Sequence, residues 1–182
     1  MDMVRMMLKH GADVNLQGGR RGQTPLFSAT SENRIEIIEL LLAHGANPIH
    51  EDDYGETALT ASVWEQSIES VEMILGAGGD VNQQNAKRVT VLHMCAKWNL
   101  LVIAEHLLKR GASIEIKAKS GRTASETADM YGNAEMSNMI KAEGIRRAKC
   151  EAFCMGLDQR LGGNSLIRVL DEGVVRMIVD YV

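Results

Sequence analysis

Apolar residues recur along this chain at helical spacing, in short blocks that are separated by polar, glycine-containing segments. The clearest block covers residues 35–42, and similar blocks cover residues 68–75 and 101–108. Apolar residues three and four positions apart lie on one face of an α-helix, so each block predicts an amphipathic helix. A glycine follows each block, and we expect it to end the helix in the left-handed conformation.

These blocks belong to an internal repeat. Two landmarks carry it, a closing glycine and a threonine that precedes a second, shorter apolar run. The glycines are Gly11, Gly45, Gly78, Gly111 and Gly144, and the threonines are Thr24, Thr57, Thr90 and Thr123. All of the threonines are equally spaced, and the glycines share this period except that the first interval is longer by one, in the loop LQGGRRG. Two independent landmarks with one period, about 33 residues, indicate repeated structural units.

Each unit is expected to contain two antiparallel helices and a projecting loop. A threonine before an apolar run is typical of a helix N-cap, and Pro25 suits the first helical position because that position needs no N–H donor. The longer apolar block forms the second helix. The residues between a closing glycine and the next threonine form a loop or short hairpin. Neither helix buries its apolar face alone, so the units must stack.

Two segments, GQTPLFSATSENRIEIIELLLAHGANP and RVTVLHMCAKWNLLVIAEHLLKRGAS, resemble the ankyrin repeat in its Gly-x-Thr-Pro-Leu-His-x-Ala opening and its Leu-Leu-x-x-Gly-Ala-Asp close. The resemblance covers residues 1–144 and implies an all-α solenoid of stacked helix-turn-helix units, with C-terminal helices after it. The units are a partial one at 1–19 and fuller ones at 20–52, 53–85, 86–118 and 119–144. Ala58, Val91 and Ala124 depart from the proline of the motif, Arg88 from its loop glycine and Ser125 from its leucine.

The resemblance also implies a concave protein-binding surface, lined by the loop tips and the exposed side of each inner helix. Carried over position by position, it predicts these partner-binding residues: Arg20, Arg21, Gln23, Ser31, Glu32, Asp53, Tyr54, Glu56, Trp64, Glu65, Lys87, Val89, Lys97, Trp98, Lys119, Ser120, Arg122, Met130 and Tyr131. The set contains both tryptophans and two of the three tyrosines, residue types that often carry interface energy. The alternative is that Trp64 and Trp98 only cover neighbouring units.

The charges in this set form bands along the repeat. The band is basic on the first full unit, acidic on the second, and basic on the third and fourth. Such bands would steer a partner of complementary charge into register. The alternative for any single charge is a solvated surface side chain.

The tail, residues 145–182, leaves the repeat pattern. Its apolar residues predict a first helix that caps the stack and, after the turn LGGNS, a second helix. They are Ile145, Ala148, Ala152, Phe153 and Leu157, then Leu170, Val174, Val175, Ile178 and Val182. The second helix weakly resembles the opening helix of an F-box, with Leu170, Ile178, Tyr181 and Val182 in matching places and Asp171 at the proline. That resemblance implies a substrate adaptor of a ubiquitin ligase, and a plain helical cap is the alternative we favour.

Composition and single residues narrow the function class. A net charge of −4 disfavours a nucleic-acid partner, and no run of the sequence is apolar and long enough to cross a membrane. Three cysteines without framework spacing, and no signal peptide, indicate a reducing compartment, cytoplasmic or nuclear. We assign structural roles to His10, His44, His93, Cys95, Cys150 and Cys154. No catalytic, metal-binding or cofactor-binding arrangement stands apart from the repeat, so we expect a non-catalytic module that binds another protein.

The first ten residues, MDMVRMMLKH, fit the outer helix of a unit without its inner partner. Met3, Val4, Met6, Met7 and Leu8 would then present an apolar face with too little cover. We expect a fragment of a longer array, an imperfect gene model, or a helix used as a makeshift cap. An added upstream unit should raise the stability.

Overall fold

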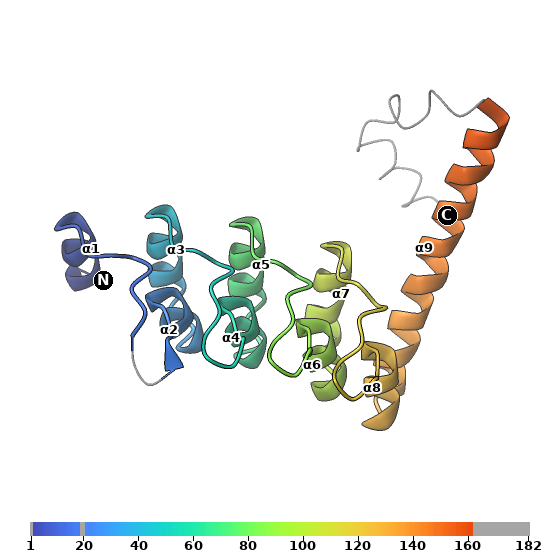
Figure 1. The fold of residues 1–182 in the computed structure, drawn as a ribbon, viewed down its shortest axis with the longest axis horizontal. Helices are drawn as coiled ribbons and strands as arrows, with labels where there is room; N and C mark the ends of the chain where they lie inside the picture. Colours follow the sequence, from blue (N-terminus) through green and yellow to red (C-terminus); the bar gives the residue numbers. More distant parts are fainter. Residues whose placement is uncertain (1, 19–20, 162–182) are drawn as a thin grey trace. The chain divides into compact units, whose positions relative to one another are not determined.

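The computed structural model describes residues 2–18 and 21–161 and consists of helices joined by loops in this part of the chain (Figure 1). Within it lie nine α-helices and no strand beyond an isolated bridge between Gly18 and Gln23. The helices are α1 Asp2–Lys9, α2 Pro25–Ser31, α3 Ile35–Ala43, α4 Ala58–Trp64, α5 Ile68–Gly76, α6 Val91–Trp98, α7 Leu101–Lys109, α8 Ala124–Met130 and α9 Ala134–Leu161. The predicted all-α class is confirmed. The chain divides into two compact units after Asn138.

The first unit contains two rows of helices (Figure 1). The inner row is α2, α4, α6 and α8, and the outer row is α1, α3, α5 and α7. Each inner helix packs against the next, and α2, α4 and α6 also pack against the outer helix that follows them. Leucines at one register position, Leu26, Leu59 and Leu92, are fully buried between these helices. Stacking of the repeats therefore produces one continuous core, although a single repeat has no core of its own.

The four threonines start the inner helices as predicted. Thr24, Thr57, Thr90 and Thr123 occupy the N-cap positions of α2, α4, α6 and α8. The last three form capping boxes, in which the side chain three positions on returns a hydrogen bond to the cap. The side chains that return these bonds are those of Thr60, His93 and Glu126. Pro25 lies at the first position of α2, as expected.

Four of the five closing glycines also behave as predicted. Gly11, Gly45, Gly78 and Gly111 have φ values of 81°, 82°, 95° and 85°. The residue after each one donates its N–H to a carbonyl five positions earlier, as in Ala46 to Leu41 and Ala112 to Leu107. This is the Schellman pattern, which satisfies carbonyls at the helix end.

The expectation for Gly144 is wrong, because α9 runs through it without interruption from Ala134 to Leu161. The residue that follows each glycine that ends a helix is small (Ala12, Ala46, Gly79 or Ala112), but Gly144 is followed by Ile145. In addition, Glu143 pairs with Arg146 at 2.5 Å and with Arg147 at 2.7 Å, three and four positions further along the helix. Such pairs stabilise continuous helix on both sides of the glycine. The domain boundary at residue 144 stays a prediction.

A third periodic landmark was not recognised in the sequence. The turn from inner to outer helix places Asn33, Gln66, Asn99 and Gly132 in the left-handed region, each one repeat period from the next. Asparagine tolerates this conformation better than most residues, which explains its use at two of the four positions. The neighbouring Asn133 donates its side-chain amide to the Ala96 carbonyl at 2.8 Å and so ties α8 to the preceding inner helix.

Helix α1 has the exposed apolar face that the sequence predicts. Met3, Met6 and Met7 are all largely exposed. Within residues 2–18 and 21–161, no inner helix pairs with α1 in the way that α2 pairs with α3. The interpretations as a fragment, an imperfect gene model or a makeshift cap stay predictions.

Candidate functional site

The predicted binding residues that the structure describes lie on two parts of the compact unit that ends at Asn138. The first part is the loop tips, residues 21–23, 53–56, 86–89 and 119–122. The second is the C-terminal ends of the inner helices. Backbone hydrogen bonds join the loop tips into a row. Asp53 donates to Arg21, Ala86 to Tyr54, and Lys119 to Lys87, at 3.0, 2.9 and 2.9 Å between N and O. Each bond joins the same two positions of adjacent repeats, so the repeat itself sets the register of the row. The side chains at the tips are therefore held at regular intervals.

Asparagine and aspartate side chains shape two of these loops. The Oδ1 atom of Asp52 accepts hydrogen bonds from the backbone N–H groups of Tyr54 and Glu56, at 2.9 and 3.0 Å. Asn85, at the same position of the next repeat, does the same for Lys87 and Val89. This local bonding fixes the turn without strand pairing within the loop. It positions the residues expected to meet a partner.

At the loop tips, the structure brings Arg21 and Tyr54 together. The Arg21 Cζ atom lies 5.1 Å from the centroid of the Tyr54 ring, within cation–π range. Arg21, Asp53, Tyr54, Lys87, Lys119, Ser120 and Arg122 are exposed, whereas Gln23, Glu56 and Val89 are half-buried. Arg20 lies outside the described residues. The predicted loop-tip residues are therefore divided between exposed side chains and half-buried ones.

The second group lies where the inner helices end. Positions 31, 64, 97 and 130 form one register row, and positions 32, 65, 98 and 131 form the next. Within them, the Lys97 Nζ atom lies 5.9 Å from the Trp98 ring centroid and 5.7 Å from the Tyr131 ring centroid. We name Lys97, Trp98, Met130 and Tyr131 the helix-end cluster. All four side chains are exposed, with Trp98 at 43%.

Trp64 partly covers its neighbour and partly faces solvent. Its ring contacts the buried Phe27 of α2 edge to face, with centroids 6.1 Å apart and planes at 79°. The exposed fraction of Trp64 is still 38%. The alternative interpretation, that the tryptophans only cover neighbouring units, therefore applies to one side of Trp64. The other side is exposed to solvent.

The predicted set includes the acidic residues Glu32 and Glu65 near the ends of the inner helices, but not Arg34, which pairs with Glu32. Glu32 forms an ion pair with Arg34 at 3.5 Å between Oε2 and Nε, and both side chains are more than half exposed. Arg34 was missed because it follows the turn residue Asn33 and falls outside the family's motif. Glu65 is exposed and occupies the register position of Trp98. Since Arg20 is not described, the basic band of the first full unit has Arg21 as its observed member.

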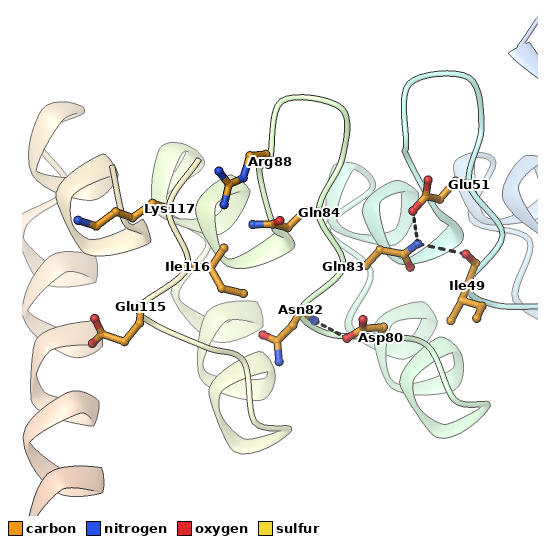
Figure 2. Close-up of a pocket in the computed structure, with 10 residues that line it drawn as sticks. All are labelled: Ile49, Glu51, Asp80, Asn82, Gln83, Gln84, Arg88, Glu115, Ile116 and Lys117. Atoms are coloured by element: carbon orange, nitrogen blue, oxygen red, sulfur yellow. Dashed lines mark hydrogen bonds between the residues drawn. The ribbon is translucent and has the colours of Figure 1, made fainter. Parts of the chain in front are cut away.

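A polar groove lies where three consecutive segments lead from the closing glycines to the loop tips (Figure 2). Its volume is about 790 Å³, and its lining residues are Ile49, Glu51, Asp80, Asn82, Gln83, Gln84, Arg88, Glu115, Ile116 and Lys117. None belongs to the predicted set, although positions 49, 82 and 115 share one register and the period could have found them. Gln83 Nε2 donates to Glu51 Oε1 at 2.7 Å and to the Ile49 carbonyl at 3.2 Å, which links neighbouring units. The hydrogen bonds of Gln83 in the groove therefore join neighbouring repeats.

An ion cluster also links the outer helices α5 and α7. Glu72 accepts a hydrogen bond from His106 Nδ1 at 2.9 Å and forms an ion pair with Arg110. The hydrogen bond from His106, with help from Arg110, lowers the pKa of Glu72 although partial burial opposes the shift. The cluster holds no second carboxylate or thiol, and no group of three or more potential metal ligands occurs in residues 2–18 and 21–161.

His93 and Cys95 have the structural roles predicted for them. Cys95 is fully buried, and burial raises the pKa of its thiol to about 12, so the thiol stays protonated at neutral pH. His93 Nδ1 accepts from the Thr90 N–H at 3.3 Å, and Nε2 lies 3.1 Å from the Arg122 carbonyl. His93 therefore connects α6 to the next loop. Burial lowers its pKa because the charged ring would lose solvent, although the hydrogen bonds to the Arg122 and Ile116 backbone oppose the shift.

We expect acid to destabilise the array through His93. The unfolded chain takes up a proton near pH 6.5, whereas folded His93 resists protonation to lower pH. The stability is therefore complete above about pH 6.5 and falls as the pH drops towards the folded pKa, by at most about 1.4 kcal/mol per pH unit. Urea unfolding from pH 7.5 to pH 5 would measure the fall. His93→Gln should flatten it, and an equally steep fall in that variant would contradict the role of His93.

Comparison with known sequences agrees with this architecture. The family model described as "Ankyrin repeats (3 copies)" matches residues 1–85, and "Ankyrin repeat" matches residues 88–119. The human 2-5A-dependent ribonuclease is 44% identical over 57 residues, which is 31% of this chain and 8% of that protein. Human SH3 and multiple ankyrin repeat domains protein 2 is 29% identical over 139 residues, or 76% of this chain and 8% of that protein.

A viral relative aligns over more of both chains. Ankyrin repeat protein FPV031 of fowlpox virus is 30% identical over 154 residues, which is 80% of this chain and 45% of that protein. The chain thus spans between 8% and 45% of the length of these three relatives. No helix in the described part of the chain is long and apolar enough to span a membrane. Ankyrin repeats indicate a protein–protein interaction module. On its repeat period, its stacked helix pairs and both family matches, the chain belongs to the ankyrin-repeat family.

Proposed function

We propose that this array binds a partner protein along its inner row, through the loop tips and the exposed ends of the inner helices. The observation that carries the proposal is the exposure of Trp64, Trp98 and Tyr131 in adjacent register rows. Large aromatic side chains bury much area for little lost rotamer freedom, so they commonly supply binding energy when a partner covers them. The partner-binding residues predicted from the sequence are part of this proposal.

The test is a Trp64→Ala, Trp98→Ala double variant. We expect its affinity for the partner to fall at least about tenfold, because two exposed anchors are removed. Affinity purification followed by mass spectrometry would compare the proteins retained by the wild type and by the variant. Leu16→Ala, Val102→Ala is the matched control, since it removes two exposed large apolar side chains that do not lie on inner helices.

Two measurements decide the outcome. Circular dichroism and thermal melting should first establish that the double variant is folded. A folded variant that retains the same proteins with unchanged affinity would refute the inner row as the binding surface. Loss of binding in both double variants would indicate a non-specific effect of reduced apolar surface.

The second candidate function is a substrate adaptor of a ubiquitin ligase, acting through Leu170, Ile178, Tyr181 and Val182. These residues lie outside the described part of the chain. One relative, the Arabidopsis protein XBAT34, is named a putative E3 ubiquitin-protein ligase; it is 41% identical over 59 residues, and the chain covers 16% of it. If the tail acts as an F-box helix, the full chain should bind the adaptor subunit that F-box helices contact. A pull-down without binding would remove this candidate.

A further inference from the structure

We infer that the helix-end cluster binds an acidic segment of the partner that carries an apolar side chain between its carboxylates. This inference rests on the proposed function and adds the chemistry of the ligand. The cluster combines one ammonium group with three large exposed side chains, Trp98, Met130 and Tyr131. A ligand that satisfies both features needs negative charge and an apolar group close together.

The position of Lys97 is the first step of the argument. Its Nζ atom lies 5.9 Å from the ring centroid of Trp98, at the end of its own helix, and 5.7 Å from that of Tyr131, at the end of α8. The two rings favour an ammonium group near their faces, which limits the range of positions that the long side chain samples. A carboxylate approaching Lys97 therefore meets a partly ordered donor and loses less entropy on binding.

The exposed charges of α6, α8 and the loop tips before them are on balance basic, which favours an anion at this end of the array. Lys87, Lys119 and Arg122 are exposed at the third and fourth loop tips, and the first two are tied by the backbone bond between Lys119 and Lys87. Helix α8 carries two exposed carboxylates: Glu126, which accepts a hydrogen bond from the Thr123 N–H at the N-cap, and Asp129, which precedes Met130. Lys87, Lys97, Lys119 and Arg122 outnumber them. In contrast, the charged members of the predicted set in the second full unit are all acidic: Asp53, Glu56 and Glu65. An acidic segment is attracted to the α6–α8 end and repelled from the α4 end.

The two tryptophans provide separate reporters for these two ends. Each gives one indole N–H signal in a nitrogen-15 correlation spectrum, and Trp64→Phe and Trp98→Phe assign them. The probe is the peptide GSDEFEDSG with blocked termini, titrated into the full chain. We expect the Trp98 signal to move and the Trp64 signal to stay. The amide analogue GSNQFQNSG and the basic analogue GSKKFKKSG should leave Trp98 unchanged at the same concentrations.

Lys97→Met supplies the matched test, since methionine keeps an apolar stem and removes the ammonium group. We expect the peptide to bind about 1.4-fold to fivefold more weakly, the effect of one exposed charge pair. The control Lys109→Met changes the net charge equally on outer helix α7, where Lys109 pairs with Glu105. That control should bind as the wild type does. Raising the salt from 20 to 500 mM should weaken binding by the wild type.

Several results would overturn the inference. They are a Trp64 response in place of Trp98, equal responses to the acidic and amide peptides, equal losses in both lysine variants, or no response to the acidic peptide. A stronger Trp98 response to a single-stranded octathymidylate would assign the cluster to nucleic acid instead, because bases stack on aromatic side chains. None of these results affects the outcome of the affinity purification with the double tryptophan variant. The proposed function and this inference can therefore fail separately.

Discussion

Leu107→Ala is expected to lower the free energy of unfolding by about 2–5 kcal/mol, the range for a buried leucine truncated to alanine. Leu107 is fully buried in α7, which packs against the inner helix α6. Truncation removes apolar contacts and leaves a cavity that the stacked helices fill only partly. Urea unfolding followed by circular dichroism would measure the loss. In an array stabilised by contacts between neighbours, this loss weakens the coupling of units on both sides.

Met7→Ala is the matched control, because Met7 occupies the same register position in α1 and has 54% of its surface exposed. We expect a change of about 0.5 kcal/mol or less, as for an ordinary surface substitution. Both residues precede the closing glycine of an outer helix by the same number of positions, so their place in the helix does not separate them. A loss for Met7→Ala of about 2 kcal/mol or more, the range of a buried truncation, would mean that α1 is covered in solution. Equal small losses for both would contradict the buried position of Leu107.

Gly55→Ala is the second change for which we expect a large effect. Gly55 has a φ of 73°, and a Cβ atom there would lie 2.8 Å from the Ala86 backbone nitrogen. That nitrogen donates to the Tyr54 carbonyl in the row of loop tips. Strain from the left-handed conformation costs about 1–2 kcal/mol, and the clash must additionally displace Ala86. We expect a total loss above about 2 kcal/mol, measured by urea unfolding.

Two variants at the same register position separate strain from clash. Gly121 has a φ of 78°, and a Cβ atom there meets nothing within 4 Å, so Gly121→Ala should show the strain alone. Arg88 has a φ of 57° without being glycine, so Arg88→Gly should relieve strain and raise the stability by about 1 kcal/mol or less. Equal losses for Gly55→Ala and Gly121→Ala would show that the close approach to Ala86 has no energetic weight.

The repeat architecture could be predicted from the sequence because each signal is local. A threonine caps the helix that starts next to it, and a closing glycine ends the helix immediately before it, so Thr24 or Gly45 is interpretable without knowledge of the rest of the fold. The same periodicity places Trp64, Lys97 and Trp98 on inner helices. It fails at Gly144, where ion pairs between Glu143 and the following arginines maintain the helix. The signal there was the large Ile145, since a small residue follows each working closing glycine.

Other features depended on contacts between units. The sequence could not reveal that Lys97 lies near the rings of both Trp98 and Tyr131, since Tyr131 belongs to the next repeat and its approach is set by the packing of α6 on α8. Nor could the sequence show that one side of the Trp64 ring contacts Phe27 while the other side faces solvent. The walls of the polar groove lined by Gln83 come from three units, and the repeat period relates its positions 49, 82 and 115, so only the side-chain contacts across the groove required the structure.

The sequence predicted the repeat, the starts of the inner helices, the ends of the outer helices up to α7 and the family, because backbone conformation and capping depend on neighbouring residues. The tertiary structure alone decided which side chains remain exposed and which meet. Burial and charge contacts are properties of stacked units, and residues with identical local patterns can differ completely in environment. Met7 and Leu107 are the clearest case, since they share one register position while one is exposed and the other is in the core.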